Sequence, residues 1–145
     1  MKISAKTEYA CIAMLELASR FGSGEPVRIR KIAERHDVPP RFLVQIILQL
    51  KGAGLVASTR GAAGGYHLVR PPESVSLGDV MAVIEGTSNG AGKVTSNASP
   101  DSPAVKVLSA AWQEIGKLER KLLGDISFAE LLDRAREQDE QMYYI

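Results

Sequence analysis

The sequence predicts a mainly α-helical chain with one small β-hairpin and a long helix near its C-terminus. An amphipathic helical pattern after Pro39-Pro40 runs directly into a glycine-tipped hairpin pattern. A second apolar pattern, after residue 103, follows the 4-3-4-3 spacing of a helix that packs on a partner helix. With 145 residues, of which 45% are hydrophobic, the chain can bury one core. We therefore expect a helix-and-hairpin domain over residues 1–85, a flexible loop over 86–103, and a helical region over 104–145.

Two short helices open the predicted domain. The first begins with Ser4 as N-cap and ends at Arg20, before two glycines. The second spans Val27–Arg35 and turns its basic side chains outward. Among these, Arg28 is the one that we expect at a phosphate.

The third predicted helix starts at Pro40, because proline is tolerated in a first helical turn. Placing residues 100° apart gives it two different faces. The inward face consists of Leu43, Ile46, Ile47, Leu50 and Gly54; the outward face consists of Arg41, Val44, Gln45 and Leu48, with Gln49 on the flank. A guanidinium, amides and aliphatic groups together suit the base edges and thymine methyls of DNA.

The hairpin pattern pairs Leu55–Thr59 with Tyr66–Arg70 around a glycine-rich tip. Glycines there permit positive φ and the close approach of another backbone, which we expect to be a sugar-phosphate edge. A helix followed by such a hairpin is the winged helix-turn-helix arrangement, with the helix in the major groove and the wing at a minor groove. The wing residues predicted to contact DNA are Arg60, Gly64, Gly65 and Tyr66.

The charges divide the chain into two halves. Residues 1–72 contain eleven Lys and Arg against five Asp and Glu, a net charge of +6. Residues 73–145 contain seven Lys and Arg against twelve Asp and Glu, a net charge of −5. Chance could segregate charges in this way, but a basic half joined to an acidic half is typical of a polyanion-binding domain with a separate assembly region.

The run SxRGxxGGYxLxRPP, over residues 58–72, resembles the sequence pattern of the Rrf2 family of bacterial transcription regulators. Tyr9-Ala10, Ile32-Ala33-Glu34 and Gly54-Leu55-Val56 agree with that resemblance. It covers residues 1–85 in sequence and the remainder only in layout. It implies a winged helix-turn-helix regulator that binds pseudo-palindromic double-stranded DNA as a homodimer.

The C-terminal region is predicted to supply the dimer interface. Ser76 and Asp79 form a capping pattern for a short helix to Glu85, and Ser102-Pro103 fit the start of a long one. Its apolar seam comprises Ala104, Leu108, Ala111, Ile115, Leu118 and Leu122, flanked by Val105 and Trp112. The family resemblance implies dimerisation through this helix, although packing within the chain is the alternative. A final helix follows the capping pattern at Ser127, and the tail from Arg136 is expected to dock or to fray.

The sequence offers little reactive chemistry. Relatives of this type hold an iron–sulfur cluster with three cysteines in the loop that corresponds to residues 86–103, and here that loop has none. Glu8 and His36 lie near positions that a few relatives use as auxiliary ligands. Cys11 is the one cysteine, and we interpret it as a small buried hydrophobe. We therefore expect no metal and no cofactor, with a cluster or thiol redox sensor as the alternative.

Other classes of function fit less well. No phosphate-binding glycine loop, paired-carboxylate motif or nucleophile–base spacing indicates an enzyme. No stretch approaches the length of a membrane span, so we expect a cytoplasmic protein without a membrane partner. A winged helix that binds protein is a further alternative. The expected function is a transcriptional regulator that represses by occupancy, controlled by a small molecule between the wing domain and the long helix, by a protein effector, or by oxidation of Cys11.

Overall fold

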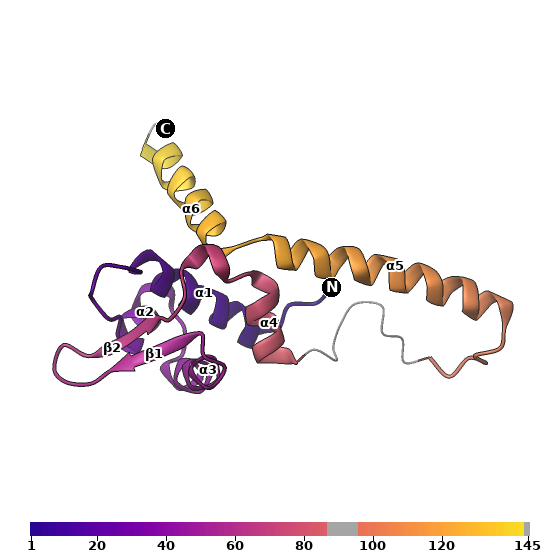
Figure 1. The fold of residues 1–145 in the computed structure, drawn as a ribbon, viewed down its shortest axis with the longest axis horizontal. Helices are drawn as coiled ribbons and strands as arrows, with labels where there is room; N and C mark the ends of the chain where they lie inside the picture. The colour runs from indigo at the N-terminus through magenta and orange to yellow at the C-terminus, as the bar shows by residue number, and fades with distance from the viewer. Residues whose placement is uncertain (87–95, 144–145) are drawn as a thin grey trace.

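The computed structural model describes residues 1–86 and 96–143 and contains helices with one hairpin (Figure 1). The elements are α1 (Ala5–Ser19), α2 (Ile29–His36), α3 (Pro40–Gly52), β1 (Val56–Thr59), β2 (Gly65–Leu68), the 3-10 turn η1 (Pro72–Ser74), α4 (Leu77–Glu85), α5 (Pro103–Asp125) and α6 (Phe128–Tyr143). In Figure 1 the first four helices and the hairpin cluster together, while α5 projects away from them. The predicted fold class is confirmed.

The core lies between α1, α3 and the elements around them. Its fully enclosed side chains include Met14 and Leu17 of α1 and, as predicted, Leu43, Ile46, Ile47 and Leu50 of α3. The prediction that Gly54 belongs to this inward face is wrong. Gly54 lies beyond the end of α3, exposed, with a φ of 81°. It turns the chain from α3 into β1, a conformation that glycine adopts without strain.

Three helix starts follow the predicted capping chemistry, whereas Ser102, the N-cap residue of α5, makes no side-chain capping bond. The Ser4 side chain accepts a hydrogen bond from the Thr7 amide at the start of α1. At α4, Ser76 and Asp79 form both halves of a capping box. The Ser127 hydroxyl accepts a hydrogen bond from the Glu130 amide (3.1 Å) at the start of α6. These bonds satisfy amides that the first helical turn leaves without a partner.

The second helix begins two residues later than predicted, at Ile29. Val27 exchanges two backbone hydrogen bonds with Tyr66, each 2.8 Å long, and so forms an isolated β-bridge to the edge of the hairpin. The hairpin offers unpaired backbone groups along its edge, and a β-branched residue after Pro26 fits there better than in a helix. Arg28 consequently becomes the N-cap residue of α2.

The wing is a two-stranded antiparallel hairpin in which Val56 pairs with Leu68 and Thr59 pairs with Gly65. Its strands are shorter than the predicted ones, although the Val69 amide still donates to the Leu55 carbonyl (3.1 Å). Gly65 therefore belongs to β2 and not to the tip.

The C-terminal helices leave the core and then return to it. α5 packs on α4 through its C-terminal part, where the backbone at Leu123 and Gly124 comes within van der Waals distance of a side chain placed at Gly78. Phe128 of α6 is fully buried in the same core as α1 and α3. The tail beyond Arg136 continues α6 as far as Tyr143. Residues 87–95 of the predicted loop and residues 144–145 lie outside the described residues.

Candidate nucleic-acid interface

The outward face of α3 carries the side chains that the helical pattern assigned to it. Arg41, Val44, Gln45 and Gln49 are all exposed, and so are Phe42 and Leu48. Arg41 lies in the first turn, so its guanidinium is near the N-terminal end of the helix. This face presents hydrogen-bond donors, amide acceptors and apolar groups from one rigid element, which is what reading base edges requires.

The wing places Arg60 in solvent at its shoulder, next to the tip. The glycines at the wing tip were expected to admit a sugar-phosphate backbone, but they lie close to another part of this chain. A Cβ at Gly64 would collide with the Thr59 carbonyl oxygen, and a Cβ at Gly65 would lie 2.6 Å from the Val27 carbonyl oxygen. The close backbone that these glycines admit is therefore the chain's own. Contacts of Gly64 and Gly65 with DNA stay predictions, as does that of Tyr66, whose ring packs partly against the core.

Two contacts that the sequence did not predict connect the wing to the helices beside it. The Lys51 ammonium at the end of α3 donates a hydrogen bond to the Ser58 hydroxyl of β1 (2.9 Å). The Val27 bridge connects Tyr66, one residue pair from the wing tip, to the segment before α2. Both pairs join residues from different elements, so no local spacing could have indicated them.

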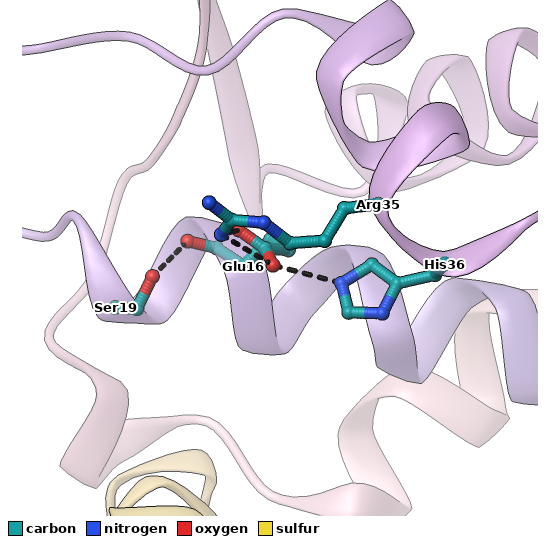
Figure 2. A network of polar contacts seen from close by, with 4 residues as sticks. All are labelled: Glu16, Ser19, Arg35 and His36. Carbon is teal, nitrogen blue, oxygen red and sulfur yellow. Dashed lines mark hydrogen bonds and ion pairs between the residues drawn. The ribbon is translucent and has the colours of Figure 1, made fainter.

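A cluster of polar side chains, not predicted either, fixes the end of α2 on α1 (Figure 2). The Glu16 carboxylate accepts from the Arg35 guanidinium at 3.0 Å through both oxygens, and one oxygen lies 2.7 Å from Nε2 of His36. Burial raises the pKa of Glu16, but hydrogen bonds from His36 and Arg35 outweigh it, so the pKa is lowered from its ordinary 4.5. The cluster lies directly before the turn at Asp37, whose φ is 53°. It therefore fixes the end of α2 from which the chain turns into α3.

A second polar contact ties the end of α4 to the start of α1. One Glu85 carboxylate oxygen accepts from the Ser4 hydroxyl (2.8 Å) and from the Thr7 hydroxyl (2.7 Å). These bonds lower the pKa of Glu85. Beside them, a cleft of about 1060 Å³ opens between the N-terminal segment, α4 and α5. Its wall includes three cations (Lys2, Lys6 and Arg120), three carboxylates (Asp79, Glu85 and Glu119) and apolar side chains such as Met81 and Leu123.

Cys11 is set against the core as a protonated thiol. Burial, and then the charges of Glu8 and Glu85, raise its pKa from 9.0 to about 11. The thiolate is the form that acts as a nucleophile or binds a metal, and a lowered pKa makes it available at neutral pH. The environment of Cys11 raises the pKa and therefore favours neither role. Within residues 1–86 and 96–143, no three His, Cys, Asp or Glu side chains gather in a way that could hold a metal ion.

The seam of α5 is exposed along most of its length. Leu108, Trp112, Ile115, Leu118 and Leu122 all face solvent, and Ala104 and Ala111 lie exposed between them. The part of α5 that packs on α4 lies near its C-terminal end, at Leu123 and Gly124. Intrachain packing, the alternative considered above, therefore leaves the apolar seam uncovered among the described residues.

A helix with exposed base-reading groups, followed by a two-stranded wing on a basic helical body, defines a winged helix-turn-helix DNA-binding regulator. Residues 3–134 match the family described as "Rrf2: Iron-dependent Transcriptional regulator". The chain belongs to this Rrf2 family, as its sequence predicted.

Relatives and solved structures agree with that assignment. The HTH-type transcriptional regulator CymR of Bacillus subtilis is 33% identical over 146 residues, covering 100% of both chains. The solved structure of CymR, the global cysteine regulator of B. subtilis, superposes with a TM-score of 0.79 at 30% identity, over 92% of this chain and 98% of CymR. IscR of T. potens superposes with a TM-score of 0.77 at 36% identity, over 95% of this chain and 90% of IscR. Among the described residues, no helix has the length and apolar character to cross a membrane.

Proposed function

We propose that the chain is a homodimeric repressor that occupies a pseudo-palindromic operator in the cytoplasm. The observation that carries this proposal is the exposed face of α3, where Arg41, Val44, Gln45 and Gln49 project beside a wing that exposes Arg60. α3 enters the major groove of one half-site, and Arg60 enters the adjacent minor groove. The backbone at Gly64, Gly65 and Tyr66, next to the wing tip, is the proposed contact with the sugar-phosphate backbone of the duplex.

The dimer forms through the seam of α5. A stripe of large apolar side chains along a 23-residue helix is unfavourable in water, and a second copy of the same helix buries it. A two-fold interface uses the same surface on both protomers, which matches the two-fold symmetry of a palindromic operator.

Selection of bound fragments from genomic DNA, followed by shift assays at increasing salt, tests the proposal. We expect one pseudo-palindromic duplex to bind at least about a thousandfold more tightly than random DNA, with affinity falling steeply as salt rises. If the dimer distinguished no genomic duplex from random DNA, the proposal would fail. A winged helix that binds protein predicts that outcome.

Single substitutions divide the roles within the reader. Arg41→Ala and Gln45→Ala should each weaken the free energy of binding to the operator by about 1–3 kcal/mol and relax the preference at particular base pairs. Arg28→Ala weakens operator and random DNA by the same factor, because a phosphate contact carries no sequence information. Equal losses from all three variants on every sequence would contradict the assigned face of α3.

The signal is sensed without an iron–sulfur cluster. The loop lacks cysteines, and the raised pKa of Cys11 keeps its thiol protonated. We expect protein purified without oxygen to be colourless and its operator affinity to be unaffected by an iron chelator. A brown preparation with iron and sulfide bound in simple ratio to the protomer would contradict this expectation.

The cleft beside Glu85 is the proposed site for a small-molecule effector. Its wall combines three cations with three carboxylates and with apolar side chains, which favours a ligand that carries charged or polar groups beside an apolar part. Because α1, α4 and α5 all contribute to the cleft, a ligand there would alter how the reading domain sits on the dimer helix. Lys6→Gln with Arg120→Gln should leave basal operator binding intact and abolish the response to the effector. A retained response would favour the other proposed input, a protein effector.

A further inference from the structure

The exposed face of α3 is divided into two parallel stripes. Arg41, Gln45 and Gln49 follow one another at intervals of four residues and form a polar stripe. Val44, Leu48 and Gly52 do the same and form an apolar stripe beside it. Residues four apart lie one above the other on a helix, so each stripe runs along the helix axis.

Leu48 is the central residue of the apolar stripe and is 56% exposed. The other leucines and the isoleucines of α3 are fully buried, so Leu48 is not part of the core that holds the helix. Its neighbours leave it accessible. Gly52 has no side chain, and no atom lies within 4 Å of where its Cβ would be.

The major groove of DNA contains one apolar group, the 5-methyl group of thymine. A polar stripe that reads hydrogen-bonding edges, running beside an apolar stripe, therefore matches a half-site in which thymine methyls stand next to the hydrogen-bonded bases. Phe42, the remaining exposed apolar side chain of α3, packs its ring against Tyr9 with the centroids 6.2 Å apart but stays 51% exposed.

We propose that Leu48, supported by Val44, determines specificity by packing against a thymine methyl group in each operator half-site. This inference rests on the proposed function, because it requires α3 to lie in the major groove. A protein partner is a poorer occupant of this surface. It would have to bury the polar stripe and Arg41 together with Leu48, whereas DNA offers hydrogen-bond partners to the former and a methyl group to the latter.

Deoxyuridine substitution tests the proposal on the operator found by selection. Deoxyuridine keeps every hydrogen-bonding group of thymine and removes only the methyl group. We expect substitution at one particular thymine to weaken binding about fourfold, the worth of one buried methyl group. Substitution at the symmetric thymines of both half-sites should weaken it about fifteenfold.

Leu48→Ala should make the protein indifferent to that deoxyuridine, with a binding ratio near one between the two operators. Alanine favours helices and the site is exposed, so the variant should fold, which circular dichroism verifies. Gln49→Ala is the matched control from the polar stripe. It should lose affinity overall yet keep the fourfold preference for thymine.

The outcomes separate this inference from the proposed function. If no deoxyuridine weakened binding while Arg41→Ala still relaxed base preference, α3 would read DNA without methyl contacts and this inference would be wrong. Persistence of the thymine preference in Leu48→Ala would also overturn it. If wild-type protein bound no selected duplex, the proposed function itself would fail first.

Discussion

Charges placed in the α5 seam should split the dimer. Leu108 is 51% exposed and Ile115 is 53% exposed in the single chain, so about half of each side chain remains to be buried by a partner. Full burial of such a side chain contributes about 1.5–3 kcal/mol, and half of it about 0.8–1.5 kcal/mol. A two-fold interface contains each residue twice, so the two positions contribute about 3–6 kcal/mol to dimerisation.

Leu108→Glu combined with Ile115→Lys removes that contribution and adds the cost of burying charges. The dimer dissociation constant should rise at least about a hundredfold, which sedimentation equilibrium measures directly. A monomer keeps one reading helix and one wing, but without the second half-site its operator affinity should fall by orders of magnitude. Circular dichroism should remain that of the folded protein, because the substituted side chains are not in the core.

The matched control places the same charges on another face of α5. Gln113→Glu combined with Ala110→Lys alters exposed positions away from the seam and should leave both the dimer and operator binding unchanged. If the seam variant remained a folded dimer, the interface would have to lie elsewhere, for instance on α1. If it became a folded monomer that still bound the full operator tightly, the two-fold mechanism would be refuted.

Three further predictions concern the scaffold. Glu16→Gln should destabilise the fold by about 1–2 kcal/mol at neutral pH, a range reduced because Arg35 is half exposed. Since the pKa of Glu16 is lowered, its contribution is present above pH 4.5 and is lost as the pH falls through the lowered value. Unfolding curves of the two proteins should therefore converge in acid, and a constant gap would contradict the role of the charge. Gly65→Ala should lower the free energy of unfolding by about 1–3 kcal/mol, because the added Cβ forces the wing away from Val27. Gly52→Ala is the control, since the space around Gly52 is open. Equal melting temperatures of the two variants would count against the bridge. Cys11 should react slowly with iodoacetamide at pH 8, because its pKa of about 11 leaves little thiolate, and labelling as fast as that of a free thiol would disprove its burial.

Periodic patterns and capping residues were enough to predict most of the helices. The buried face of α3 followed from helical spacing, because side chains 3.6 residues apart share one environment. The starts of α1, α4 and α6 followed from serines whose hydroxyls bond to the next turn. Both signals depend only on residues close in sequence, so they can be recognised without knowing the fold.

Contacts between distant segments could not be obtained in the same way. Val27 looked like the first residue of a helix, and only the presence of the hairpin edge makes it a strand residue. The Glu16, Arg35 and His36 cluster joins positions about twenty residues apart, without a period to reveal it. The wing glycines were recognised as sites of close approach, but the sequence did not say that the approaching backbone is their own chain's.

The Val27–Tyr66 bridge has a mechanical consequence for the operator. Val27, in the segment before α2, and Tyr66 of β2 are hydrogen-bonded in both directions, and Lys51 joins the end of α3 to β1. These bonds restrain the wing against the two helices beside it. For the proposed binding mode, the fold then sets the distance along the duplex between the bases contacted by α3 and the minor groove contacted by Arg60. Inserting a single base pair between those two contact points should lower operator affinity as much as removing one of the contacts, since the restrained wing cannot follow the displaced groove.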